Sequence, residues 1–172
     1  MSEVVAQVRS GFQRIANNAP SLGIFYSSIH LAGWSAGAHL ASMIVVDHGA
    51  EVSLKAPASL LLISGVYDLR PLLLTSANTD LALGLAEAKG NSPLDAQAPP
   101  RVSATAILWG ARETDEFKRQ SAMLHDAWRG TLDELLSIEI PNVHHYGAMD
   151  AFGQDGSIVF QTALRLLDVP HA

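Results

Sequence analysis

The stretch of sequence that decides the fold is IHLAGWSAGAHLA, residues 29–41. Residues 28–32, which begin one residue before this stretch, predict a short β-strand that stops at Gly33. Residues 36–46 have the apolar spacing of a helix. The turn between them reads GWSAG. A sharp strand-to-helix turn brings the chain close to itself, so glycine is expected on both sides and the Ser35 hydroxyl is expected to point out above the sheet. The pattern predicts Ser35 as a nucleophile, with an ordinary tight turn as the alternative.

Helices and strands alternate along the rest of the chain. The uninterrupted apolar segment 58–64 predicts a strand buried on both faces, and further strands are predicted over 103–109 and 135–140. Amphipathic segments predict helices over 3–17, 116–129 and 157–167, and another helix is predicted over 79–88. This alternation predicts one α/β domain over residues 1–172, with a mostly parallel sheet and helices on both faces. The proline-rich segment 65–100 is expected to leave the sheet as a cap-like excursion. In such sheets, residues that carry chemistry lie at the carboxyl ends of the strands.

Composition excludes several classes of protein. Of the 172 residues, 48% are hydrophobic and 16% are charged, which indicates a compact globular chain. The 11 lysines and arginines against 17 acidic residues give a net charge of −6, so no nucleic-acid or anionic-membrane partner is expected. The sequence has no cysteine, which excludes disulfides, thiolate metal sites and a cysteine nucleophile. Without an apolar run of about 18 residues or a secretory leader, the protein is expected to be cytoplasmic.

A serine nucleophile needs a histidine base and an acid that orients it, and at such a turn the chain order is serine, acid, histidine. Four carboxylates are candidates: Glu113, Asp115 and Glu116 follow the third predicted strand, and Asp68 follows the second. Glu113 is favoured because it stands nearest the end of its strand, whereas Asp115 and Glu116 suit the first turn of a helix. The alternative is that these carboxylates are solvated or cap the helix.

Two adjacent histidines, His144 and His145, follow the last predicted strand and stand after both the serine and the acids. Either imidazole can serve as the base, and one of such a pair is expected to be a surface or supporting residue. The remaining histidines are interpreted as structural or exposed: His30, His39, His48, His125 and His171. The backbone N–H of Ala36 lies at the start of the predicted helix and is expected to donate to an oxyanion.

Three parts of the chain resemble a known family. They are IHLAGWSAGAHLA at 29–41; SGVYDLRPLLLTSAN at 64–78 with NSPL at 91–94; and WGARETDEFKRQS at 109–121 with VHHYGAMDAF at 143–152. The chain resembles the C-terminal part of an α/β-hydrolase of the kynurenine formamidase (arylformamidase) type and its esterase relatives. The resemblance implies Ser35 as the nucleophile, Glu113 at the acid position, where many relatives have aspartate, and His145 as the general base.

The same resemblance implies a serine hydrolase that cleaves a small-molecule formamide or carboxylic ester through an acyl-enzyme. The implied reaction converts N-formylkynurenine to kynurenine and formate in tryptophan catabolism, with the Ala36 N–H holding the oxyanion and no metal or organic cofactor. Two alternatives stay open: a general carboxylesterase, and an inactive remnant of a hydrolase.

Relatives of this type are longer at the N-terminus, where they carry the first strands of the sheet and an HGG stretch that supplies a second oxyanion donor. The sequence contains no HGG. The resemblance therefore implies a partial fold in which the strand before Ser35 lies at an exposed edge, and we expect a homo-oligomer formed through that edge. Loss of one oxyanion donor lowers the rate by about 10²–10³, so weak or no activity is expected of the chain alone.

Overall fold

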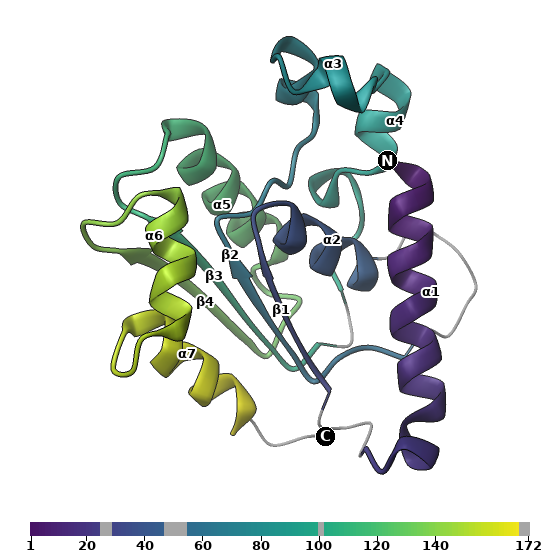
Figure 1. Ribbon diagram of the computed structural model, residues 1–172, viewed down its shortest axis with the longest axis vertical. Helices are drawn as coiled ribbons and strands as arrows, with labels where there is room; N and C mark the ends of the chain where they lie inside the picture. Colours follow the sequence, from purple (N-terminus) through teal and green to yellow (C-terminus); the bar gives the residue numbers. More distant parts are fainter. Residues whose placement is uncertain (25–28, 47–54, 100–101, 169–172) are drawn as a thin grey trace.

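Four parallel strands form one sheet in the computed structural model, which describes residues 1–24, 29–46, 55–99 and 102–168. The strands pair in chain order (Figure 1): β1 (His30–Trp34), β2 (Ser59–Ile63), β3 (Ala104–Gly110) and β4 (Glu134–Ile140). Because all four strands run the same way, their carboxyl ends lie at one end of the sheet. The predicted α/β architecture with a parallel sheet is confirmed.

The two central strands have the most apolar sequences. Every residue of β2 is buried, and β3 is buried except at Trp109. A strand covered on both faces needs apolar side chains on both, so these segments are continuously apolar and do not alternate. β1 and β4 are only partly buried and form the two edges of the sheet within the described residues. The GWSAG turn therefore comes directly after an edge strand.

β1 differs from the strand predicted over 28–32. It runs from His30 to Trp34, because Gly33 and Trp34 continue the parallel pairing, opposite Leu62 and Ile63 of β2. Residue 28 lies outside the described residues. The other three strands agree with the prediction to within one residue at each end.

Helices cover both faces of the sheet, and five of those described carry most of the packing: α1 (Ser2–Asn18), α2 (Ala36–Val45), α5 (Asp115–Trp128), α6 (His145–Asp150) and α7 (Ile158–Leu167). Figure 1 shows how they are layered. α2 and α5 pack on one face of the sheet, and α1 packs on the outside of α2 through Phe12 and Ala16. α6 and α7 pack on the other face.

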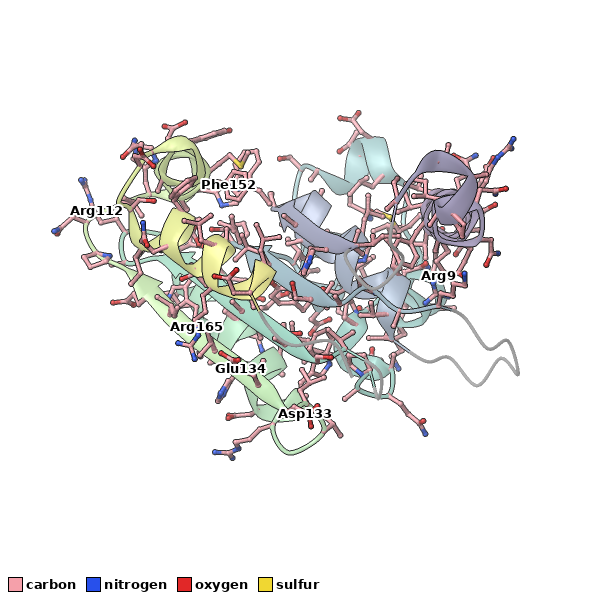
Figure 2. All side chains as sticks on the ribbon, turned by 90° about the horizontal axis from the view of Figure 1, so that it is seen from below. Arg9, Arg112, Asp133, Glu134, Phe152 and Arg165 are labelled. Carbon is pink, nitrogen blue, oxygen red and sulfur yellow. The ribbon has the colours of Figure 1, made fainter. Side chains whose placement is uncertain are left out.

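Polar side chains tie the outer helices to this framework (Figure 2). Arg165 of α7 lies beside Glu134, the first residue of β4, and forms a 2.7 Å ion pair with it. Arg9 of α1 donates to the backbone oxygens of Met43 and Val46 at the end of α2, at 2.5 and 3.3 Å. These contacts hold α1 and α7 on opposite sides of the molecule.

The segment between β2 and β3 leaves the sheet. Its described part contains η3 (Arg70–Leu74), α3 (Asn78–Leu81), α4 (Leu85–Gly90) and η4 (Pro93–Asp95), and Figure 1 shows α3 and α4 beyond the carboxyl ends of the strands. The single helix predicted over 79–88 is wrong. Ala82 takes a left-handed conformation with φ 49°, and the Asn78 side chain bonds both backbone groups of Leu83, so the chain turns between α3 and α4.

Short helices elsewhere have no periodic signal in the sequence. η1 (Ala19–Leu22) follows α1, and α6 runs directly into η5 (Ala151–Gly153). A helix of six residues such as α6 is too short for an apolar stripe to repeat, which is why pattern analysis misses it. Among the residues that the structure describes, no helix combines the length and apolar character needed to span a membrane.

Candidate active site

Ser35 lies between β1 and α2 in a strained backbone conformation. Its φ of 56° and ψ of −120° fall in a region that costs an L residue about 1–3 kcal/mol. The Ser35 N–H donates to the carbonyl of Ile63 at 2.9 Å, and the Ser35 carbonyl accepts from the N–H of Ala38 at 3.1 Å. The turn is thus held by β2 on one side and by α2 on the other, and it leaves Ser35 partly exposed.

The two glycines of GWSAG have different roles. A Cβ at Gly33 would lie 2.3 Å from the backbone oxygen of Gly37, so position 33 requires glycine. A Cβ at Gly37 would meet nothing within 4 Å. The expectation that the turn needs glycine on both sides is therefore wrong for Gly37, because the close approach is made by its carbonyl and leaves room for a side chain.

His145 reaches both Ser35 and Glu113. Its Nε2 lies 3.0 Å from Ser35 Oγ, and its Nδ1 lies 3.2 Å from Glu113 Oε1. A carboxylate can only accept hydrogen bonds, so the proton of a neutral imidazole belongs on Nδ1, and Nε2 is left to accept the Ser35 hydroxyl. This is the tautomer in which His145 can act as a base toward Ser35.

The neighbouring histidine has a different task. His144 is the N-cap of α6, and its Nδ1 accepts the backbone N–H of Gly147 at 3.2 Å. A side chain that caps its own helix satisfies a backbone donor that the helix cannot. Of the two histidines that the sequence left as alternatives, only His145 faces Ser35.

Glu113 is buried and aims one oxygen at His145. Its side chain has no exposed surface, and its Oε2 has no hydrogen-bond partner among the described residues. The backbone there is fixed, since Glu113 N–H donates to Gly110 at 3.0 Å and Arg112 N–H donates to Val143 at 2.9 Å. The second of these bonds joins the loop that carries Glu113 to the loop that leads into His145.

The other candidate acids are engaged elsewhere. Asp68 accepts two bonds from the Arg70 guanidinium, at 2.7 and 3.0 Å. Burial works against the charged form of Asp68, but the bonds from Arg70 outweigh it and lower the pKa of this carboxyl. Glu116 pairs with Arg119 at 2.7 Å, which lowers the pKa of Glu116. Asp115 is exposed in the first turn of α5.

The other histidines that the structure describes lie apart from this cluster. His39 is buried in α2, where its Nε2 donates to the carbonyl of Asn91 at 2.7 Å and burial lowers its pKa. His30 Nδ1 lies 2.8 Å from Ser59 Oγ, and His125 lies 3.5 Å from Asp126. His48 and His171 lie outside the described residues.

Two aromatic residues at the site were not found from the sequence. The ring centroids of Trp34 and Phe117 lie 4.9 and 4.5 Å from that of His145. Phe117 reads as part of an apolar helix face with Leu124 and Trp128, but those two are buried in the core and Phe117 is only partly buried beside the imidazole. Trp34 is a variable position of the G-x-S-x-G pattern, so the motif gives no signal for it.

The Ala36 N–H completes the group of polar atoms near Ser35. Ala36 is the first residue of α2 and is exposed, and an N–H at this position has no acceptor within its own helix. A hydroxyl that faces an imidazole can attack a carbonyl group when a carboxylate supports the imidazole. A backbone N–H at the start of a helix can then stabilise the oxyanion that forms.

The parallel sheet, its flanking helices and the strand–serine–helix turn define the α/β-hydrolase fold. Solved structures with this fold are similar to the chain. A candidate thioesterase from Silicibacter sp. TM1040 matches 91% of this chain and 57% of its own, with a TM-score of 0.69 and 24% identity. An esterase of Thermogutta terrifontis, solved with propionate bound, matches 95% of this chain and 62% of its own, with a TM-score of 0.65 and 21% identity.

Within this class the chain is similar to kynurenine formamidases. It is 27% identical to the kynurenine formamidase of Salmo salar and 25% identical to that of Danio rerio, in each case over 97% of this chain. The resemblance found in the sequence is confirmed. The chain spans 58% and 57% of the length of these two relatives. No protein-family model matches the chain.

Proposed function

We propose that this chain is a serine hydrolase that cleaves a formamide or carboxylic ester bond through an acyl-enzyme. One observation carries the proposal: Ser35 Oγ, both imidazole nitrogens of His145 and Glu113 Oε1 form one continuous series at hydrogen-bond distances of 3.0 and 3.2 Å. Such a series activates a serine hydroxyl that is otherwise a weak nucleophile.

In the proposed reaction, Ser35 Oγ attacks the carbonyl carbon while His145 Nε2 takes the hydroxyl proton. The carbonyl oxygen becomes an oxyanion and accepts a hydrogen bond from the Ala36 N–H. His145 then returns the proton to the leaving amine or alcohol, and an acyl ester remains on Ser35. Water deprotonated by the same imidazole hydrolyses this ester, which releases the acid and restores the hydroxyl.

Glu113 acts behind the imidazole. Its carboxylate accepts the Nδ1–H, which holds His145 in the tautomer that leaves Nε2 free, and it stabilises the imidazolium formed during the attack. Burial of the Glu113 side chain strengthens this interaction, because water does not screen the charge.

The substrate that we propose is N-formylkynurenine, by analogy with the kynurenine formamidases to which the chain is similar. Its hydrolysis would place a formyl group on Ser35 and release kynurenine as the leaving amine. A formyl group is the smallest acyl group, so a formyl ester on Ser35 needs little space.

Hydrolysis of N-formylkynurenine and of p-nitrophenyl acetate tests the proposal. The parent chain is compared with Ser35→Ala and with Ser64→Ala, whose hydroxyl is buried and has no partner among the described residues. We expect Ser35→Ala to fall to the rate in buffer and Ser64→Ala to match the parent chain. Measurable activity of the parent chain that Ser35→Ala retains in full would contradict the mechanism, whereas no activity in either would favour the inactive-remnant alternative. Ester hydrolysis without formamide hydrolysis would replace the proposed substrate by the carboxylesterase alternative.

A further inference from the structure

The His145 imidazole is held by more than its two polar partners. The Trp34 and Phe117 rings lie 4.9 and 4.5 Å from it between centroids, tilted by 37° and 35°. These distances and tilts are typical of attractive aromatic pairs. Tyr146 also approaches, at 5.7 Å, but it is 68% exposed, whereas Trp34 and Phe117 are partly buried. Trp34 and Phe117 are therefore the two rings that can restrain the imidazole.

Trp34 makes a second contact with the same residue. Its indole N–H donates to the backbone carbonyl of His145 at 3.1 Å. Trp34 directly precedes Ser35 and is the last residue of β1, where it pairs with Ile63 and packs against the core on the α6 side of the sheet. Two adjacent residues of the turn thus contact His145: Ser35 bonds the His145 imidazole, and Trp34 bonds the His145 backbone carbonyl.

Phe117 and Glu113 lie close together in the sequence, and both contact His145. It lies in the first turn of α5, four residues after Glu113, so the same loop and helix supply the carboxylate at Nδ1 and a ring against the imidazole. The N–H of Phe117 donates to the carbonyl of Thr114 at 3.1 Å, which fixes its backbone at the helix start.

We propose that Trp34 and Phe117 are positioning residues that keep the His145 imidazole aligned between Ser35 and Glu113. The proposal rests on the proposed function, in which His145 is the base. His145 needs such support because it is the first residue of a six-residue helix and 23% of its side chain is exposed. The hydrogen bond from Trp34 fixes the position of the His145 backbone relative to the sheet, and the Phe117 ring limits rotation of the His145 imidazole. A displacement of about 1 Å at a reacting group can cost about 10²-fold in rate.

Two variants separate these roles. Trp34→Phe keeps a ring and removes the N–H, and Phe117→Leu keeps apolar volume and removes the ring. Trp109→Phe is the matched control, since it removes an indole N–H that donates to Glu139 at 3.2 Å, from a tryptophan that packs on the opposite face of the sheet. For Trp34→Phe and Phe117→Leu we expect kcat to fall about tenfold or more with KM unchanged. For Trp109→Phe we expect kcat and KM within twofold of the parent.

Nitrogen NMR of the histidine rings tests the proposal without catalysis. The His145 signals are identified by their absence in His145→Gln. In the parent chain we expect a single tautomer with the proton on Nδ1, and in Trp34→Phe and Phe117→Leu we expect averaged signals from two tautomers. Trp109→Phe should leave the signals as they are in the parent.

Separate readouts distinguish the two proposals. If the parent chain hydrolyses neither substrate, the proposed function fails, and the NMR comparison still decides the positioning roles. If both variants fold, keep kcat within twofold and keep a single tautomer, the positioning proposal is overturned. If Trp34→Phe does not fold, Phe117→Leu decides, because its ring is removed at a partly exposed position where folding depends on it less.

Discussion

Two neighbouring strands of this protein are each followed by a serine with a positive φ. Ser35 follows β1 with φ 56°, and Ser64 follows β2 with φ 50°. Each donates its N–H to the next strand, Ser35 to Ile63 at 2.9 Å and Ser64 to Leu108 at 2.7 Å. Only Ser35 is reachable and faces an imidazole, whereas Ser64 is fully buried and its hydroxyl has no partner among the described residues.

The difference lies in the path of the chain beyond each serine. After Ser35 the chain enters α2, and Ser35 stays partly exposed. After Ser64 the chain folds the Tyr67 ring back over Gly65, where an added Cβ would lie 2.4 Å from the ring. The residue type and the positive φ are therefore shared, and what distinguishes Ser35, the proposed nucleophile, is its exposure and its contact with the His145 imidazole. Neither feature is local to the serine.

The largest expected difference is in kcat, between variants of Asp68, which follows β2, and of Glu113, which follows β3. Glu113→Gln removes the acceptor that fixes the His145 tautomer, and we expect kcat to fall by about 10³–10⁴. Asp68→Asn changes a carboxylate bound by Arg70, and we expect kcat within twofold of the parent. Rates of p-nitrophenyl acetate hydrolysis measure both. A larger loss in Asp68→Asn than in Glu113→Gln would transfer the role of the acid to Asp68.

The two turn glycines give the next contrast, in stability. Gly33→Ala forces a Cβ against backbone atoms of Gly37 and Ala38 at 2.3–2.6 Å, and we expect a loss of about 3 kcal/mol in the free energy of unfolding. Gly37→Ala places a methyl group in open space within α2 and should be neutral or stabilise by up to about 1 kcal/mol. Urea denaturation measures both. Similar losses for the two variants would show that the turn is not packed as described.

The smallest expected effect is the contribution of Asp68, which follows β2, to the pH dependence of the free energy of unfolding. The pKa of Asp68 is lower in the folded chain than in the unfolded chain, because the bonds from Arg70 outweigh burial. This stabilisation is present above the unfolded pKa of about 4 and is lost as the pH falls through the folded pKa. Since Arg70 is 38% exposed, we expect Asp68→Asn to be less stable by only about 1 kcal/mol at pH 7.

Thermal unfolding from pH 7 down to pH 2 tests this sign. The difference between Asp68→Asn and the parent chain should shrink below about pH 4. A difference that grows as the pH falls would show that the folded chain raises the pKa of Asp68.

The sequence predicted the framework because continuous apolar segments and a G-x-S-x-G turn are local signals. The strands and the nucleophile turn needed no knowledge of distant residues. The choice between His144 and His145 could not be made from the residues alone, because it depends on where α6 begins and which side chain caps it. The roles of Trp34 and Phe117 depend on contacts with a residue far away in the chain, which no periodic pattern records.

Peptide mapping after reaction with a fluorophosphonate probe tests most directly whether Ser35 is the activated serine. The probe phosphonylates an activated serine hydroxyl and forms a stable adduct, so the modified residue can be located by fragmentation of the labelled peptide. We predict a single adduct on Ser35 of the parent chain, with none on Ser64, and no adduct after His145→Gln. An adduct on another serine, or labelling of Ser35 that persists without the His145 imidazole, would contradict the account.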